Sequence, residues 1–306
     1  MIYDLIIIGA GPSALTAAIY TAREDIKTLL IEKGVVGGLM ATIDNIENYP
    51  GFPSGIEGLQ LAEEFQKQAE KFGAEIRMFT TVEKVEKSGK MFKITTDDGV
   101  FESRSLLIAS GNSYRKLNIP GEEHVHYCAT CDGALYRDKK LVIIGGANAA
   151  IQEAMFLTKF ASHIDLVVRS TIKASEVLQK ELAKFVKSGK IAVHEGTTPD
   201  EIVTEDGKIT AVKAHDTKNS EQKSQFDCDG VFVFAGVVPN TGFLDGSGVD
   251  LDKAGHVITR TGHDMMTNVD GIFASGDVRS GATKQVASAV GEGVTAAISI
   301  REFLNK

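Results

Sequence analysis

The chain has 306 residues, of which 43% are hydrophobic and 24% charged, and its formal net charge is −8. This is the composition of a globular protein long enough for two ordinary domains. It has no lysine–arginine run typical of a nucleic-acid track and no apolar run near the roughly 20 residues of a membrane span, so we expect neither partner. Because the N-terminus also lacks a signal-peptide pattern, we expect a soluble, cytoplasmic protein.

The first part of the chain predicts a β-α-β unit followed by further strands. Residues 34–58 are rich in glycine and proline and predict a loop. Apolar periodicity predicts helices at 14–24 and 59–72 and strands at 4–8, 28–32, 77–81, 82–88, 92–96 and 105–109. This alternation is typical of an α/β domain.

The turn after the first strand carries the pattern of a nucleotide-binding loop. Gly9 permits a tight turn, Gly11 lets the backbone approach a pyrophosphate, and Ala14 allows close packing of the following helix. Glu32 ends the second strand at the spacing of a carboxylate that binds ribose hydroxyls. A carboxylate there suits an adenosine ribose without a 2′-phosphate, so FAD or NAD fits this turn better than NADP.

Two cysteines then occur three residues apart, as Cys128 and Cys131, and Asp132 follows directly. Such a pair can close a disulfide across a tight turn, and a neighbouring carboxyl can give or take a proton when that disulfide opens. Zinc normally needs four ligands, for which only His124 and His126 lie nearby, so we favour redox chemistry and expect no metal. The third cysteine, Cys228, is expected to be a buried apolar residue at the start of a strand.

A second β-α-β unit follows the cysteines, and a closing segment ends the chain. The unit predicts helices at 150–160 and 175–188 and strands at 141–144, 164–169, 191–194, 201–204, 209–215 and 230–235. The closing segment predicts a strand at 271–274 and a helix at 285–303. We therefore expect two Rossmann-like dinucleotide-binding domains in three layers, the second inserted into the first, with the insertion at 115–242 and the first domain at 1–114 and 243–306.

The order of several short motifs resembles that of the low-molecular-weight thioredoxin reductases. The matching pieces span nearly the whole chain and are Gly9–Ala14, Gly37-Gly38, Ile46–Phe52, Ala109-Ser110-Gly111, Cys128–Gly133, Gly236–Asn240, Gly276-Asp277-Val278 and Lys284-Gln285. The resemblance implies FAD in the first domain, thioredoxin as the substrate and a homodimer. One departure is Leu39, which replaces the glutamine usual after the Gly-Gly pair.

The resemblance also implies roles for individual residues. Cys131 would be the sulfur nearer the flavin, Cys128 would attack the partner disulfide, and Asp132 would serve as the general acid/base. Residues implied in FAD binding are Gly9, Gly11, Pro12, Ser13, Ala14, Glu32, Gly38, Asn48, Ala109, Gly111, Gly276, Asp277, Lys284, Gln285 and Val286.

The second nucleotide turn departs from the pattern by which this family binds NADPH. Its middle glycine is Ala147, and the His-Arg-Arg cluster that grips the 2′-phosphate reads Val168-Arg169-Ser170, followed by Lys173. Serine and valine cannot rebuild a bidentate arginine grip on a phosphate. We therefore expect another electron donor. The eroded motifs resemble those of the ferredoxin-dependent flavin thioredoxin reductases within the wider family, and this resemblance implies ferredoxin first. The alternatives are a drifted NADPH site, a deazaflavin donor, a dithiol oxidase that uses oxygen, and a flavoprotein that senses redox state without turnover.

Overall fold

The computed structural model describes residues 2–43, 45–46, 48–127, 129–261 and 263–306, and only the backbone of Thr130 and Cys131. The chain divides into two compact units. One comprises Met1–Ser113 and Val238–Lys306, and the other comprises Tyr114–Val237. The inserted unit begins one residue before the expected boundary and ends five residues before it. The two chain segments that join the units are β7 (Asn112–Tyr114) and β15 (Val237–Pro239), which pair with each other.

The first unit is built on a seven-stranded sheet with the order β3-β2-β1-β6-β5-β4, and β16 also pairs with β6. Strands β1, β2, β3 and β16 run parallel to their neighbours, whereas β4, β5 and β6 form an antiparallel meander. The strands are β1 Ile2–Ile8, β2 Thr28–Ile31, β3 Glu75–Arg77, β4 Val82–Ser88, β5 Met91–Thr96, β6 Gly99–Ile108 and β16 Ile272–Ala274.

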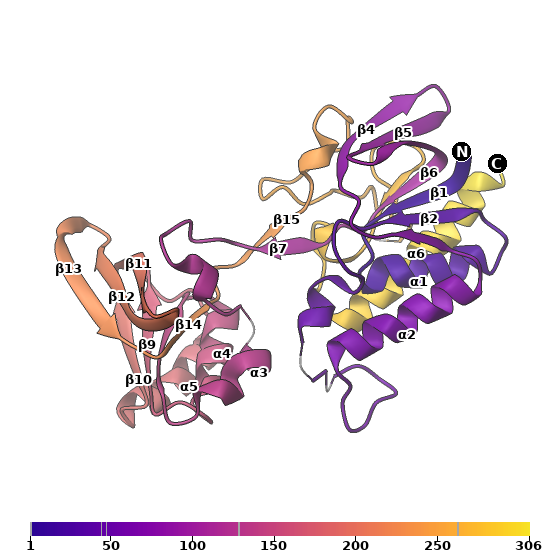
Figure 1. The fold of residues 1–306 in the computed structure, drawn as a ribbon. Coiled ribbons are helices and arrows are strands. Elements are labelled where there is room, and N and C mark those ends of the chain that lie inside the picture. Colours follow the sequence, from indigo (N-terminus) through magenta and orange to yellow (C-terminus); the bar gives the residue numbers. More distant parts are fainter. Residues whose placement is uncertain (1, 44, 47, 128, 262) are drawn as a thin grey trace. The chain divides into compact units, whose positions relative to one another are not determined.

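Three helices cover one face of this sheet (Figure 1), namely α1 (Pro12–Ala22), α2 (Gly58–Lys71) and α6 (Val286–Leu304). The strands alternate in the face to which they contribute. Leu5 and Ile7 join the core under the helices, while Ile6 and Ile8 join the core on the other face with residues of β4 and β5. Because both faces are covered, β1 is apolar at successive positions, as expected for a buried parallel strand.

The inserted unit has three layers. A parallel sheet with the order β10-β9-β8-β14 lies between helices on one side and the antiparallel sheet β11-β12-β13 on the other (Figure 1). The helices are α3 Ala129–Asp132, α4 Asn148–Leu157 and α5 Glu176–Lys187. The strands are β8 Lys140–Ile144, β9 His163–Val168, β10 Ile191–Glu195, β11 Thr197–Glu205, β12 Lys208–Asp216, β13 Asn219–Asp227 and β14 Gly230–Val233.

The predicted elements agree with the structure except at a few places. The strand expected at 77–81 is wrong, because β3 ends at Arg77 and Phe79 adopts a left-handed φ of 55° that extended backbone does not allow. The loop 34–58 contains a short 3-10 helix, Gly38–Thr42. Strands β7, β13 and β15 and helix α3 were not expected; β13 is an edge strand with almost every residue exposed, so its sequence lacks apolar alternation. Within the described residues, no helix is both long and apolar enough to cross a membrane.

Candidate active site

The first nucleotide turn lies at the carboxyl edge of the main sheet. Ile8 is paired in register with Ile31 on one side and Ile108 on the other, so the turns after β1, β2 and β6 share this edge. Gly9 has a φ of 106°, and a Cβ atom there would lie 2.5 Å from the carbonyl oxygen of Ala109. Only glycine therefore fits between the two turns.

Glu32 lies at the same edge and is held by the backbone. Its carboxylate accepts hydrogen bonds from the N–H groups of Ala10 and Gly34, both at 2.9 Å. It borders a cavity of about 250 Å³ that Gly9, Thr80 and other residues of this unit also line. A carboxylate has about four lone-pair sites, so Glu32 can still accept hydrogen bonds from ribose hydroxyls.

The start of α1 forms an open backbone cradle. Pro12 stands at the first helical position, and no atom lies within 4 Å of where a Cβ atom of Gly11 would be. A Cβ atom on Gly38 would lie 3.6 Å from the Cα of Gly11, so the two glycines face each other without side chains between them. The N-terminus of a helix attracts anions, and a pyrophosphate fits such a cradle.

Close packing against α6 fixes this end of α1. Ser13 Oγ lies 2.6 Å from Ser275 Oγ, and both side chains are buried. A Cβ atom on Gly293 would lie 2.4 Å from the carbonyl oxygen of Ser13, so α6 approaches the first turn of α1 at backbone distance. Ala14 is fully buried in the same contact region.

The 3-10 turn Gly276–Val278 leads from β16 towards α6, and two residues that the sequence did not single out hold it. Glu292 accepts a hydrogen bond from the N–H of Gly276 at 2.8 Å and a bidentate pair of bonds from Arg279. Both side chains of this ion pair are about seven-eighths buried, with 14% and 12% exposed. No sequence signal marks the pair, because its members meet only when α6 docks.

Asp277 follows Gly276 and is half-buried. Burial raises the pKa of its carboxyl above the usual value, and no residue in the described ranges forms a hydrogen bond with it. Such a carboxyl can accept a hydrogen bond from a ligand hydroxyl, as the flavin's ribityl chain would supply.

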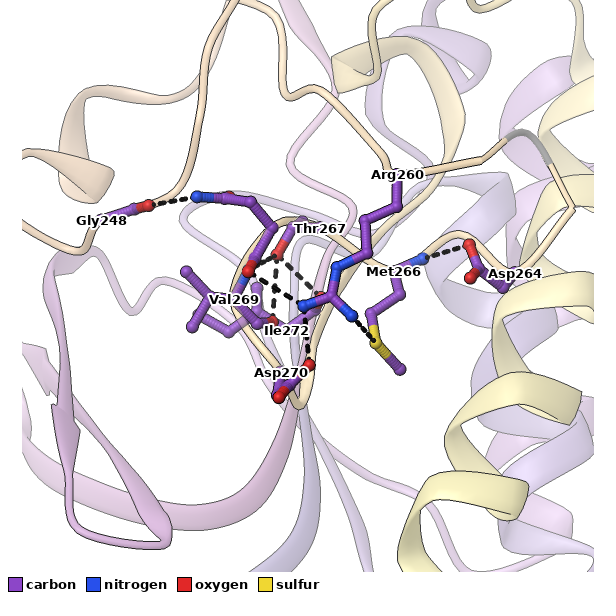
Figure 2. A network of polar contacts seen from close by, with 9 residues as sticks. Gly248, Arg260, Asp264, Met266, Thr267, Val269, Asp270 and Ile272 are labelled. Carbon is purple, nitrogen blue, oxygen red and sulfur yellow. Dashed lines mark hydrogen bonds and ion pairs between the residues drawn. The ribbon is translucent and has the colours of Figure 1, made fainter.

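A network of polar contacts holds the segment before β16 (Figure 2). Arg260 donates to the carbonyl of Asn268 at 3.0 Å and to Asp270 Oδ1 at 2.6 Å, and Thr267 Oγ1 donates to the carbonyl of Ile272 at 2.9 Å. These contacts fix the turn that feeds β16, and through it the position of Asp277.

The remaining residues implied in flavin binding lie on loops of the first unit, apart from Val286 at the start of α6. Asn48 and Gln285 are brought together although 237 positions separate them, with Asn48 Nδ2 donating to Gln285 Oε1 at 3.0 Å. Lys284 and Gly111 have left-handed backbones, with φ of 59° each, and Val286 begins α6. Taken with the cradle at Gly11, these groups fit FAD.

The cysteine segment lies in the inserted unit. Cys128 and the side chain of Cys131 lie outside the described residues, and α3 spans Ala129–Asp132. Asp132 Oδ2 lies 2.9 Å from His126 Nδ1, and His126 Nε2 lies 2.7 Å from the hydroxyl of Tyr136. Both ring nitrogens of His126 are thus engaged by the protein.

Among the described residues no group of three potential ligands could hold a metal. Cys228 is buried as expected, and burial raises the pKa of its thiol to about 12.

The second nucleotide turn repeats the strand-to-helix geometry of the first with different chemistry. Gly145 has a φ of 148°, and a Cβ atom there would lie 2.4 Å from the carbonyl oxygen of Phe234. Ala147 caps α4 and is exposed. Val168 is only 3% exposed, and its Cγ1 atom lies 2.5 Å from the Cβ position of Gly146. An apolar side chain therefore lies against the turn, at the position where the resemblance implies a histidine of the phosphate-binding cluster.

A pocket of about 690 Å³ nevertheless remains at this edge of the inserted sheet. Its lining includes the four basic residues Arg115, Lys116, Arg169 and Lys173. Lys116 Nζ lies over the Tyr127 ring at 4.3 Å, and no carboxylate of the described ranges forms an ion pair with any of the four. The sequence had not indicated Arg115 and Lys116, because they precede the β-α-β unit.

Comparison with known proteins identifies the family. The model of the pyridine nucleotide-disulphide oxidoreductases matches residues 3–293. The chain belongs to this family. It is 38% identical to a thioredoxin reductase of Bacillus subtilis over 312 residues, which cover 100% of this chain and 96% of the relative. It also resembles the crystal structures of thioredoxin reductases from Lactococcus lactis (TM-score 0.81, 38% identity, 99% of each chain) and from T. acidophilum (TM-score 0.79, 32% identity, 98% of each chain).

Membership confirms the fold class, with two Rossmann-like domains, and the enzyme class, a flavin-dependent disulfide oxidoreductase. FAD is the cofactor of these enzymes, in agreement with the cradle at Gly11 and the carboxylate of Glu32. The individual residue contacts expected from the sequence stay predictions.

Proposed function

We propose that this chain is an FAD-dependent thioredoxin reductase that takes its electrons from ferredoxin rather than from NADPH. The observation that carries the donor assignment is the second nucleotide turn, where Val168 is buried under Gly146 and Ala147 replaces the glycine at the phosphate. Thioredoxin as the substrate rests on the likeness to thioredoxin reductases over the whole chain.

The residues of the chain have separate roles in this proposal. FAD, when bound, supplies the store of two electrons that links the donor to the disulfide. The Cys128–Cys131 disulfide receives the electron pair and becomes a dithiol. Cys128 then attacks the disulfide of thioredoxin, and Asp132 protonates the thiolate that leaves. Glu32, Asp277 and the cradle at Gly11 hold the cofactor.

The donor assignment follows from what a dinucleotide requires. The adenosine 2′-phosphate of NADPH needs a directional grip, which arginine forks provide and a valine or serine cannot. The pyrophosphate needs a glycine where the backbone approaches it most closely, and the methyl group of Ala147 takes that space. Ferredoxin delivers single electrons to a flavin and needs no nucleotide pocket, so these changes do not impair electron transfer from ferredoxin.

The basic pocket favours a second candidate, an NADPH-dependent thioredoxin reductase whose site has drifted. The volume of about 690 Å³ is large enough for a nucleotide, and Arg169 and Lys173 supply positive charge. If this candidate holds, NADPH binds to the isolated enzyme, and Arg169→Ala weakens that binding.

Turnover with purified thioredoxin tests the two candidates. The enzyme receives either NADPH or photochemically reduced ferredoxin under anaerobic conditions, and free thiols of thioredoxin are measured. The proposal expects two ferredoxins to be oxidised for each disulfide reduced, and only background with NADPH. NADPH-driven turnover at a rate equal to that with ferredoxin would overturn the donor assignment. Consumption of oxygen by a dithiol instead would identify an oxidase.

A further inference from the structure

A chain of three polar side chains lies beside the C-x-x-C segment, and only Asp132 has a role in the proposed reaction. His126, two residues before Cys128, lies between Asp132 and Tyr136. Its Nδ1 atom lies 2.9 Å from Asp132 Oδ2, and its Nε2 atom lies 2.7 Å from the hydroxyl oxygen of Tyr136. Both separations are hydrogen-bond distances, so the imidazole links the acid to the phenol.

Packing fixes both rings. His126 stacks on Phe232, with centroids 5.1 Å apart and planes at 29°, and Tyr136 meets Phe232 edge-on at 5.6 Å. Phe232 is fully buried in the inserted core. A Cβ atom on Gly230 would lie 2.2 Å from the Tyr136 ring, so a glycine is required there for the ring to lie where it does.

The backbone of His126 is fixed as well. Its N–H donates to the carbonyl of Val231 at 2.9 Å, and its own carbonyl accepts from Val233 at 2.8 Å. The histidine is therefore attached to β14, the last strand in the order of the inserted parallel sheet, and not to a free loop. A ring held from both sides and from its backbone can orient a neighbouring carboxylate.

The His126 ring can form both hydrogen bonds whether the imidazole is neutral or protonated. Asp132 as a carboxylate accepts from Nδ1–H. Burial, and next the charge of Asp132, raise the pKa of Tyr136, so it stays a neutral phenol that can donate to a bare Nε2 or accept from Nε2–H. The other charged or titratable groups facing the phenol are Cys228 and Asp229.

We infer that His126 is a positioning residue for Asp132, which orients the carboxyl and supplies the proton that it delivers to the leaving thiolate. The inference rests on the proposed thiol–disulfide exchange but not on the identity of the electron donor. Tyr136 supports it by binding Nε2 in both protonation states.

The proton and electron movements balance within the exchange. The Cys128 thiolate forms a bond to one substrate sulfur as the substrate S–S bond breaks, and the electron pair stays on the departing sulfur. That sulfur takes the proton of the Asp132 carboxyl, and the carboxylate left behind recovers a proton from Nδ1 of protonated His126, which becomes a neutral imidazole whose Nε2–H donates to the Tyr136 hydroxyl. The Cys131 thiolate then attacks Cys128, restores their disulfide and expels the second substrate thiolate, which takes a proton from solvent. Solvent also restores the proton of His126.

A comparison of leaving groups tests the inference. Enzyme reduced with dithionite under argon is mixed with thioredoxin, with hydroxyethyl disulfide, or with the aryl disulfide dithiobis(nitrobenzoate). Alkyl thiolates leave faster when protonated, whereas the aryl thiolate leaves as an anion and needs no acid. The variants are His126→Phe and Tyr136→Phe, which keep the rings. The control is His215→Phe, which removes another histidine–aspartate pair of the inserted unit, with His215 Nδ1 at 2.7 Å from Asp200 Oδ1.

We expect His126→Phe to slow the reduction of thioredoxin and of hydroxyethyl disulfide about tenfold at pH 8 and to leave the rate of reduction of the aryl disulfide unchanged. Tyr136→Phe should show a smaller loss with the same selectivity, and His215→Phe none. Equal losses on all three substrates would show a merely structural role, and no loss on any would also overturn the inference. If wild-type enzyme reduces both small disulfides but not thioredoxin, the proposed function fails, and His126 is still judged on hydroxyethyl disulfide.

Discussion

Replacing Gly293 by alanine should loosen FAD, and the neighbouring Gly291 provides a matched control on the same helix. A Cβ atom at 293 would lie 2.4 Å from the carbonyl oxygen and 3.2 Å from the Cα of Ser13. Since comfortable heavy-atom separations are about 3.5 Å, α6 and α1 would have to part by about 1 Å. The obstacle is backbone, so no side-chain rotation relieves it.

The cost can be compared with the gain in helix propensity. Overpacking of this kind costs about 1–3 kcal/mol, while alanine in place of glycine inside a helix gains about 1 kcal/mol. Gly291 has no atom within 4 Å of its Cβ position, so Gly291→Ala should show the gain alone. Because the strain falls on Ser13, in the first turn of the FAD cradle, each 1.4 kcal/mol lost there weakens FAD about tenfold.

The assay is titration of FAD into both apoprotein variants, followed by flavin fluorescence, together with their thermal unfolding. Gly293→Ala should bind FAD about tenfold more weakly than wild type and unfold at a lower temperature. Gly291→Ala should bind FAD as wild type does and unfold at the same or a higher temperature. Equal FAD affinity in the two variants would refute the argument that α6 sets the position of the cradle.

Two further predictions concern the cysteines and acid stability. Cys131→Ser should abolish thioredoxin reduction while FAD stays bound, and Cys228→Ala, at a buried thiol outside the pair, should keep turnover; activity in Cys131→Ser would disprove the assigned role. A hydrogen bond from Ser280 and the N–H groups of His256 and Ala254 lower the pKa of Asp252 from 3.8 to about 2. This stabilisation is present above pH 3.8 and is lost as the pH falls towards 2, so urea unfolding should separate wild type from Asp252→Asn at pH 6 but not near pH 2. A difference in stability between wild type and Asp252→Asn that stays the same at both pH values would contradict this account of Asp252.

The sequence predicted the fold well where local patterns decide the structure. The turn at Gly9, its partner carboxylate Glu32 and the buried strands all follow from short-range rules of glycine geometry and apolar runs. The edge strand β13 could not be predicted in this way, because its exposed polar residues carry no periodicity and its pairing with β12 supplies the order.

The same distinction applies to the candidate site. The cysteines and Asp132 are visible as a motif, but the ion pair of Arg279 with Glu292 forms only when α6 docks on the turn after β16. His126 was noticed as a possible zinc ligand, and its hydrogen bonds to Asp132 and Tyr136 give it a different environment. Contacts that form only when separate elements pack together leave no spacing rule in the sequence.

The central claim is that the electron donor is not NADPH, and anaerobic reduction of the bound flavin tests it most directly. The enzyme is mixed in a stopped-flow instrument with NADPH, NADH, reduced ferredoxin or reduced deazaflavin, and the flavin absorbance is followed. The account predicts that ferredoxin bleaches the flavin at least as fast as thioredoxin is reduced, and that NADPH does not. Bleaching by NADPH at the rate of turnover would contradict it.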